Sequence, residues 1–342
     1  MLTTESPAKT GRIAALDFTK GTLVLVMVLY HWINYFIGPL WGYYRYLRFL
    51  TPSFIFVTGF MISNVYLSKY DAADARLPKR LFTRGIKLMA VFLVLNAART
   101  LIVPALHTGA LGGSLLDPRN IFTVFVTGNF PIAGAKLISF SILVPISYLL
   151  MLSGVLMLPF RYYRYTFHAV CLLLFLSILM LGLIGAECQN LELIAIGMLG
   201  VVVGSVPIAK INKFVRHPYA IAFAYLGYII AITIWNVPFP MQVIGVPLSL
   251  AAIYLIGPND AEPGAIGNVV ILLGKYSLFG YIAQIGILQI LSVGLHSYNN
   301  GVALQTFSFV AVIVLTIGSV ESVDRARAKA KSIDRLYKIV FA

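Results

Sequence analysis

The chain of 342 residues contains 59% hydrophobic and only 11% charged residues, and its mean hydropathy is +0.88. Soluble domains carry about 25% charged residues, so this composition excludes an ordinary soluble protein. The net charge of +14 does not indicate a nucleic-acid partner, because the basic residues gather in loops between apolar runs, where they set membrane orientation. The two cysteines, Cys171 and Cys188, provide neither a disulfide framework nor a metal-ligand spacing, and no metal is expected.

The length and the apolar runs predict an all-α fold, a polytopic membrane helix bundle of about ten transmembrane helices, since about 20 apolar residues cross a bilayer. We expect one membrane-embedded domain over residues 1–342, with cytoplasmic tails at 1–13 and 322–342. The first apolar run carries Asp17 and Lys20 and is too long for a signal peptide, so it is expected to remain as the first span. Polar breaks place the spans near 14–36, 48–68, 81–103, 137–159, 165–185, 191–209, 217–236, 240–257, 266–294 and 302–321.

The loops between these spans alternate in charge. Basic residues gather at the N-terminus, in alternate loops and in the segment after residue 321, whereas the mildly acidic loop 258–265 is the one exception. This alternation predicts that both termini are cytoplasmic. We expect the protein in the cell envelope of a bacterium, in the inner membrane. The long loop 104–136 contains a short apolar piece, 121–126, that cannot span the bilayer. It is interpreted either as a substrate-facing lid or as a disordered connector.

Ionisable groups inside a membrane span are costly and usually face the protein interior. The first span carries four polar residues, Asp17, Lys20, His31 and Asn34. Lys20 and His31 differ by only about 20° around a helix axis, and Asp17 and Asn34 fall within about 60° of that line. The four residues therefore form a stripe that is expected to face the bundle interior. The alternative is a shallow Asp17–Lys20 ion pair and a histidine that merely hydrogen-bonds a neighbour.

The third span opens with a cationic face formed by Arg80, Arg84 and Lys87, which follow helical spacing. Membrane anchoring explains the cations nearest the span's start, but Lys87 lies about two turns inside it. Such a face suits the phosphates of a ligand through charge-assisted hydrogen bonds. Arg99 at the far end of the same span is a candidate substrate contact, as are Asn34 and Gln284. No nucleotide-binding glycine loop, metalloprotease motif or nucleophile elbow is present in the sequence.

Four segments resemble motifs of the acyltransferase-3 family of membrane acyltransferases, which opens its first helix with an arginine and places a histidine eleven residues later. Here Lys20 stands in place of that arginine and His31 follows at the same spacing. The segments are RIAALDFTKG at 12–21, TPSFIFVTGFMI at 51–62, IGMLG at 196–200 and LGKYSLFGYI at 273–282. The opening Leu16-Asp17-x-x-Lys20-Gly21 resembles that of the glucan succinyltransferase and heparan-glucosaminide N-acetyltransferase types.

The resemblance implies transfer of an acyl group, with acetyl expected, from cytosolic acyl-CoA to a hydroxyl or amine of a glycan or lipid-linked sugar. It implies that His31 is the general base or a transient acyl carrier, with Lys20 and Asp17 beside it, and that Arg80, Arg84 and Lys87 hold the donor's phosphates. Two residues depart from the family pattern. Lys20 cannot make the bidentate contacts of arginine, and Gln284 replaces a frequent histidine and cannot transfer protons.

A second interpretation is a secondary transporter in which the same polar stripe lines the path of a small solute. Transporters often have related halves and helices broken at the midplane, and neither is clear in this sequence. A non-catalytic scaffold is the third interpretation, favoured only by the two departures.

Overall fold

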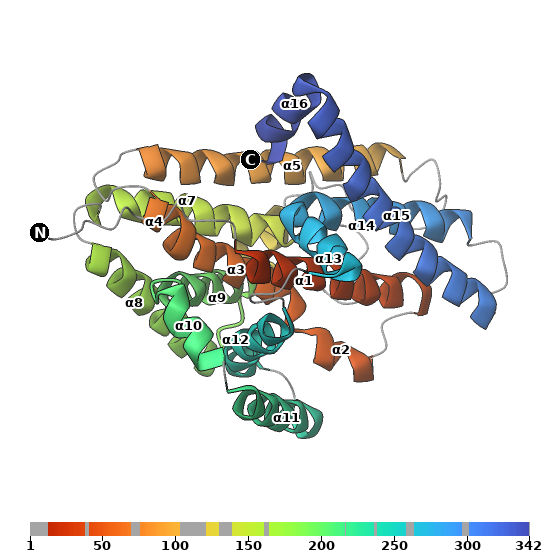
Figure 1. Ribbon diagram of the computed structural model, residues 1–342. Coiled ribbons are helices and arrows are strands. Elements are labelled where there is room, and N and C mark those ends of the chain that lie inside the picture. The colour runs from red at the N-terminus through yellow and green to blue at the C-terminus, as the bar shows by residue number, and fades with distance from the viewer. Residues whose placement is uncertain are drawn as a thin grey trace, which may run out of the picture.

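A computed structural model describes residues 13–37, 41–69, 76–102, 121–129, 139–160, 164–215, 217–235, 238–257, 263–295 and 301–341. These residues form helices and no strands (Figure 1). Helices satisfy their own backbone hydrogen bonds, which is what a spanning segment needs in lipid. The all-α membrane bundle expected from the sequence is therefore confirmed.

The first half of the chain supplies most of the helices that surround the candidate site. They are α1 (Ala14–Trp32), η1 (Ile33–Ile37), α2 (Trp41–Leu47), α3 (Leu50–Met61), η2 (Ile62–Tyr66), α4 (Leu67–Lys69), α5 (Arg76–Ile102), η3 (Thr123–Thr127) and α7 (Leu143–Phe160). The elements η1 and η2 are π-helical turns that widen the ends of the first two spans.

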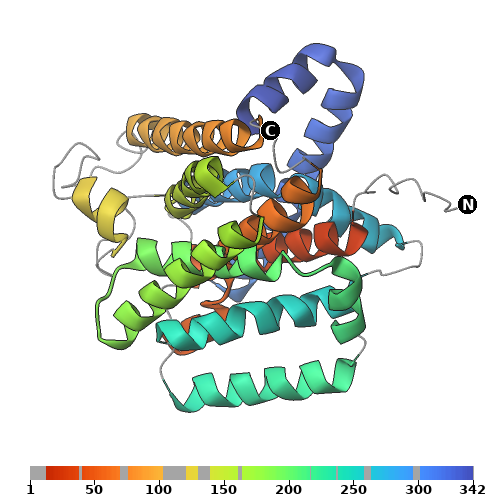
Figure 2. The same ribbon diagram turned by 90° about the vertical axis from the view of Figure 1, so that its left-hand side faces the viewer.

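The second half begins with α8 (Arg164–Leu183), α9 (Gln189–Val203) and α10 (Ile208–Val215). It continues with α11 (Pro218–Ile234), α12 (Phe239–Ile256), α13 (Ala265–Lys275), α14 (Ser277–Gly294), α15 (Val302–Lys329) and α16 (Lys331–Phe341). Helices α11 and α12 run side by side at the edge of the bundle away from α5 and α16 (Figure 2).

Within the described ranges, seven helices are long and apolar enough to cross a membrane, or eight if α9 and α10 count as one span bent by 99°. The predicted count of ten is not confirmed. The predicted spans 137–159 and 217–236 coincide with shorter apolar helices, Leu143–Pro159 and Pro218–Ile234. The predicted span 191–209 coincides with the bent pair.

The predicted span 266–294 is two helices, not one. Tyr276 adopts φ −111° and ψ 27°, which ends α13 and begins α14. Only α14 meets the length of a spanning helix. The apolar character of both pieces hid this break, because hydropathy does not report backbone direction.

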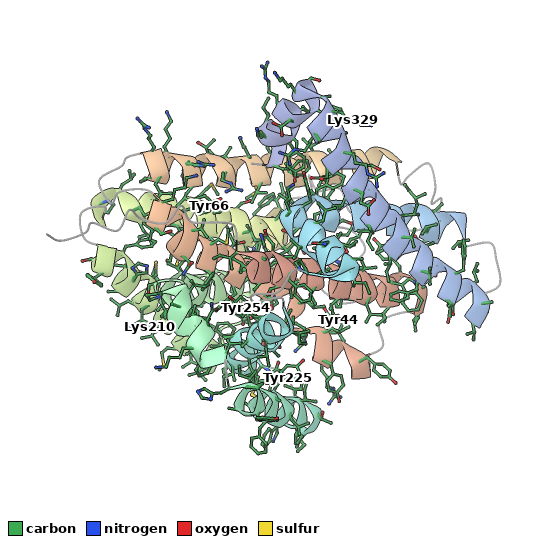
Figure 3. All side chains as sticks on the ribbon, viewed as in Figure 1. Tyr44, Tyr66, Lys210, Tyr225, Tyr254 and Lys329 are labelled. Carbon is green, nitrogen blue, oxygen red and sulfur yellow. The ribbon has the colours of Figure 1, made fainter. Side chains whose placement is uncertain are left out.

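The outer helices expose apolar side chains over long stretches. Leu173 on α8 is 63% exposed and Phe223 on α11 is 80% exposed. Charged side chains lie elsewhere, for example Lys210 on α10 and Lys329 at the end of α15 (Figure 3). Surfaces of this kind are stable only against lipid, so the chain is an integral, multi-pass membrane protein.

Three helix pairs pack with their backbones in close contact at glycines: α5 with α7, α3 with α9 and α1 with α13. A side chain on Gly59 of α3 would overlap the carbonyl of Gly197 on α9, and one on Gly200 would overlap the carbonyl of Phe56. Gly21 of α1 faces Val270 of α13 in the same way, and Gly274 faces Asp17. Small residues at such crossings let membrane helices approach closely and gain dispersion contacts.

The long loop 104–136 is described only in part, and residues 104–120 and 130–136 lie outside the described residues. The apolar piece 121–126 is helical, and its last four residues belong to η3. Asn190 of α9 holds η3 by donating to the carbonyl of Val124 at 2.9 Å. This part of the loop is anchored to the bundle.

The segment expected as a C-terminal tail, 322–342, is helical over its described residues. Helix α15 continues to Lys329, the chain turns at Ala330, and α16 folds back toward α5 (Figures 1 and 2). Lys338 and Arg327 donate to Asp334, and these hydrogen bonds hold the pKa of that carboxyl below its ordinary value. Asp334 therefore stays ionised at neutral pH. The first tail, 1–13, is described only at Ile13.

The glycine contact between α3 and α9 can be tested by adding one methyl group. Gly59→Ala should destabilise the protein by about 1–3 kcal/mol, because a Cβ there overlaps backbone that cannot move aside without parting the helices. Thermal unfolding in detergent, followed by intrinsic fluorescence, measures the change. Gly286→Ala is the control, since Gly286 on α14 has no atom within 4 Å of its added Cβ. A Gly59→Ala midpoint at or above that of the wild type contradicts the contact.

Candidate functional site

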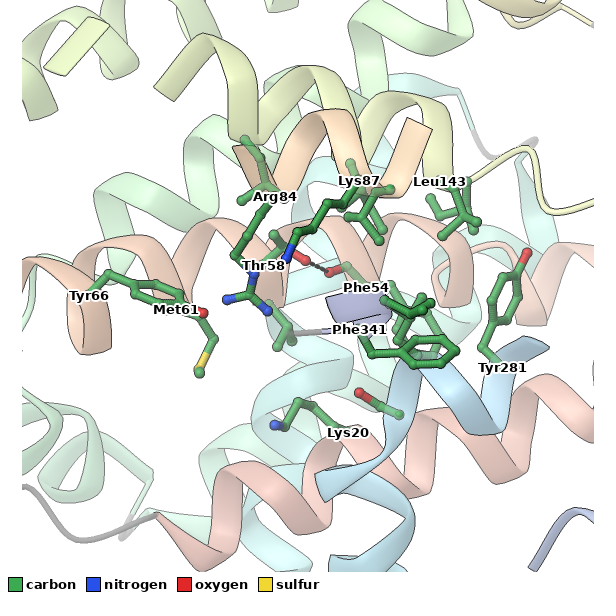
Figure 4. A pocket seen from close by; sticks show the side chains of 18 residues that line it. Lys20, Phe54, Thr58, Met61, Tyr66, Arg84, Lys87, Leu143, Tyr281 and Phe341 are labelled. Atoms are coloured by element: carbon green, nitrogen blue, oxygen red, sulfur yellow. Dashed lines mark hydrogen bonds between the residues drawn. The ribbon is translucent and has the colours of Figure 1, made fainter. Parts of the chain in front are cut away.

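A cavity of about 210 Å³ lies among α1, α3, α5, α7, α14 and α16. Its walls are mostly apolar side chains of α3, α5 and α7, and its basic residues are Lys20, Arg84 and Lys87. Arg84 and Lys87 point into it from α5, and Lys20 lies on the opposite side (Figure 4). Three cations from two separate helices thus meet around one cavity.

The charges around the cavity are partly organised by neighbouring side chains. Lys20 Nζ lies 2.6 Å from Asp17 Oδ1, so the predicted stripe begins with an ion pair. The Arg84 guanidinium carbon lies 5.4 Å from the centre of the Tyr66 ring, and that of Arg80 lies 6.0 Å from it. An arginine over an aromatic face is held by cation–π attraction while its N–H groups remain available to other acceptors.

Tyr281 of α14 forms the other end of the cavity (Figure 4). Its ring centre lies 6.2 Å from Phe54, 6.1 Å from Phe140 and 6.2 Å from His31. His31 does not line the cavity itself. Tyr281 therefore lies between the cavity and His31.

Two polar side chains near this point contain buried atoms that have no hydrogen-bond partner among the described residues. His31 Nε2 is one, and both amide atoms of Gln284, one helical turn beyond Tyr281, are the others. Gln284 is 0% exposed. A buried polar group without a partner costs about 1–3 kcal/mol, and a bound ligand or water molecule is what would satisfy these atoms.

The segment before α7 fixes one wall around Tyr281. Phe140 has φ +64°, a left-handed conformation that is strained for a bulky residue. Asn96 of α5 clamps the neighbouring Ser139, donating to its carbonyl at 2.9 Å and accepting from its N–H at 3.0 Å. This clamp stabilises the strained turn and presses Phe140 edge-on against Tyr281.

The clamp continues into a polar network on the far side of Tyr281. Gln289 of α14 donates to Ser139 Oγ at 2.9 Å and to the Tyr35 hydroxyl at 3.3 Å. Arg99, three residues after Asn96 on α5, lies near Tyr35. Polar groups from η1, α5 and α14 therefore meet beyond the aromatic rings, at the end opposite Lys20, Arg84 and Lys87.

The predicted site residues fall into three groups. Lys20, Arg84 and Lys87 line the cavity, and Asp17 pairs with Lys20. His31 and Gln284 lie behind Tyr281, and Arg99 lies toward the far network. Asn34 hydrogen-bonds the side chain of Tyr30. Arg80 does not line the cavity and stacks on Tyr66 instead. Asn34 belongs to η1, where the wider turn departs from the 100° register used to place it on the stripe.

Sequence reasoning missed the aromatic residues of the site. Tyr281 lies in the segment 273–282 and Phe54 in the segment 51–62, but the sequence assigns neither residue a role. Phe341 lies in the segment 322–342, which the sequence predicts to be a tail. An apolar repeat at 333, 336, 337 and 340 could have indicated the helix that carries Phe341. Nothing in the sequence marks Phe140 as a strained contact of Tyr281.

No protein-family model, curated protein or solved structure matches the chain. Its function must be inferred from the residues of the site and from the motifs quoted above.

The position of Tyr281 predicts how easily a reagent reaches His31. Tyr281→Ala should remove the wall between the cavity and the imidazole, so diethyl pyrocarbonate should modify His31 at least several times faster. Peptide mass spectrometry distinguishes His31 from the other four histidines. Tyr281→Phe keeps the ring and should react as slowly as the wild type. Equal rates for Tyr281→Ala and the wild type would show that the ring is not the barrier.

Proposed function

We propose that the protein is a membrane acyltransferase that moves an acyl group, acetyl by preference, from acyl-CoA to a hydroxyl or amine of a glycan or lipid-linked sugar. One observation carries the proposal: a single cavity has cations at one end and, at the other, a tyrosine in contact with a half-buried histidine whose Nε2 atom is buried and has no partner among the described residues. The motif resemblance to the acyltransferase-3 family supports the same chemistry.

The cationic end suits the phosphates of the donor. Arg84 offers a planar fork of N–H donors, whereas Lys87 and Lys20 act as point charges. Asp17 already neutralises part of the Lys20 charge, so Arg84 and Lys87 are the stronger phosphate ligands of this set. Arg80, one turn earlier on α5, positions Tyr66 and adds long-range attraction.

The cavity suits the linear part of the donor. At about 210 Å³, with mostly apolar walls, it accommodates an extended pantetheine arm and leaves the adenosine phosphates at the cationic mouth. Lys20 and His31 are separated by about 16 Å along the axis of α1, a length that this arm can bridge. Rotation of the Tyr281 ring would bring the thioester beside the imidazole.

His31 then serves as the general base. Its Nε2 accepts the proton of the acceptor hydroxyl while that oxygen attacks the thioester carbonyl. The carbon–sulfur bond breaks, and the departing thiolate takes the proton back as CoA. Gln284 offers an amide N–H to an oxygen in the same region, but it cannot move protons.

The acceptor approaches from the far side of the aromatic rings. The network of Tyr35, Arg99 and Gln289 presents hydrogen-bonding groups of the kind that recognise sugars, and Asn34 lies in the same turn as Tyr35. With both termini in the cytoplasm of a bacterium, the donor would enter from the cytosol and the sugar from the outer side of the inner membrane.

Donor binding tests the role of the cations. Arg84→Gln and Lys87→Gln should each weaken the binding of radiolabelled acetyl-CoA by about 10- to 100-fold, the value of one charge-assisted hydrogen bond. Lys79→Gln removes an equal charge from an exposed position on the same helix that does not line the cavity, and should bind as the wild type does. Equal weakening by all three substitutions would mean that only overall charge matters.

Turnover tests the role of His31. Release of CoA from acetyl-CoA by purified protein, with a panel of pyranosides as acceptors, should fall at least about 100-fold in His31→Ala while donor binding persists. Turnover unaffected by the substitution would remove His31 from the mechanism. Solute uptake into proteoliposomes without any CoA release would favour the transporter instead.

A further inference from the structure

Helix α16 presents two different faces. Its inner face carries Val340 and Phe341, which line the cavity, and Tyr337, whose ring lies 5.4 Å from that of Tyr276. Phe341 also contacts Phe279 of α14 at 5.9 Å. The helix is therefore a wall of the cavity and not a loose extension.

A compact set of charges holds α16 in this position. Arg327 of α15 donates twice to Asp334 Oδ1, at 2.9 and 2.6 Å, and Lys338 pairs with Asp334 Oδ2 at 2.6 Å. The Arg327 guanidinium also lies 4.1 Å from the centre of the Tyr337 ring. These contacts fix the angle between α15 and α16 across the turn at Ala330.

The outer face of α16 is apolar and uncovered by the described residues. Leu336 is 62% exposed and Ile339 is 57% exposed, although the segment lies directly after a spanning helix. Beside this stripe the same helix exposes Lys331 and Arg335. Around the axis, Lys331 and Arg335 occupy a sector directly beside that of Ile339 and Leu336, so cations flank the exposed apolar side chains as in a helix that lies at a membrane interface.

We propose that α16 is an anionic-lipid-binding helix. Leu336 and Ile339 insert beside the acyl chains, and Lys331 and Arg335 contact the phosphates of anionic phospholipids. The charge of the helix selects the occupant, since a neutral lipid surface would not engage these cations and an apolar protein partner would leave them unpaired. Because Val340 and Phe341 line the cavity, lipid bound on the outer face stabilises the wall of the cavity on the inner face.

Hydrogen exchange tests this proposal without any acyl donor, so its outcome is independent of the proposed enzyme activity. Full-length protein is placed in nanodiscs of phosphatidylcholine alone or with phosphatidylglycerol. Amide exchange in the peptide that covers α16 should be at least about fivefold slower with phosphatidylglycerol, the effect of one cation near an anionic surface.

Matched charge variants separate α16 from a general effect of surface charge. Lys331→Gln with Arg335→Gln should abolish the response to phosphatidylglycerol. Lys210→Gln with Lys213→Gln removes two exposed cations from α10 and should leave the response unchanged. Leu336→Gln with Ile339→Gln should speed exchange in both lipids. Equal exchange of wild-type α16 in the two lipids overturns the proposal. So does an equal loss of the response in the α16 double variant and in the α10 double variant.

Discussion

The position of the site depends on how closely α1 can approach α13. Gly21 and Gly274 are placed so that any side chain would strike the backbone of the facing helix, at Val270 and at Asp17 respectively. This contact holds the first turns of α1 against α13 while the Asp17–Lys20 pair turns Lys20 toward the cavity. The break at Tyr276 then lets α14 take a new direction, along which Tyr281 meets His31. A larger residue at either glycine would move the polar stripe and the aromatic wall apart.

Hydropathy was sufficient to predict a helical membrane protein, because apolar content and span length follow directly from the bilayer as solvent. It was not sufficient for the count of spans. The two-helix segment around Tyr276 and the bent pair of α9 and α10 are apolar on both sides of the break, so composition alone does not locate them. Helix α16 was missed for the opposite reason: its charges hid a helical repeat of apolar residues behind the appearance of a solvated tail.

For the site, the sequence was informative wherever chemistry follows helical spacing. Asp17 and Lys20, three residues apart, form the pair that their spacing allows, and Arg84 and Lys87 face one cavity from one side of α5. It was uninformative wherever a contact joins distant segments. The clamp of Asn96 on Ser139 and the strained backbone of Phe140 arise only when the segment before α7 meets α5 and α14. Arg80 shows the limit of spacing arguments. It shares with Arg84 a helical face and a contact with Tyr66, yet it does not line the cavity.

In the proposed acyltransferase, the rings of Tyr30, Tyr281 and Phe140 would limit the access of water to the activated acyl group. Tyr30 and Tyr281 contact His31 directly, and Phe140 backs Tyr281, so aromatic rings surround an imidazole whose Nε2 atom is buried. Thioesters and acyl-imidazoles both react with water, and an open site would release free acid. In an acyltransferase built on this geometry, a sugar that is large enough to displace an aromatic ring reaches the acyl carbon, whereas stray water molecules are few. The aromatic wall would thus favour transfer over hydrolysis, and its removal would turn a transferase into a slow esterase.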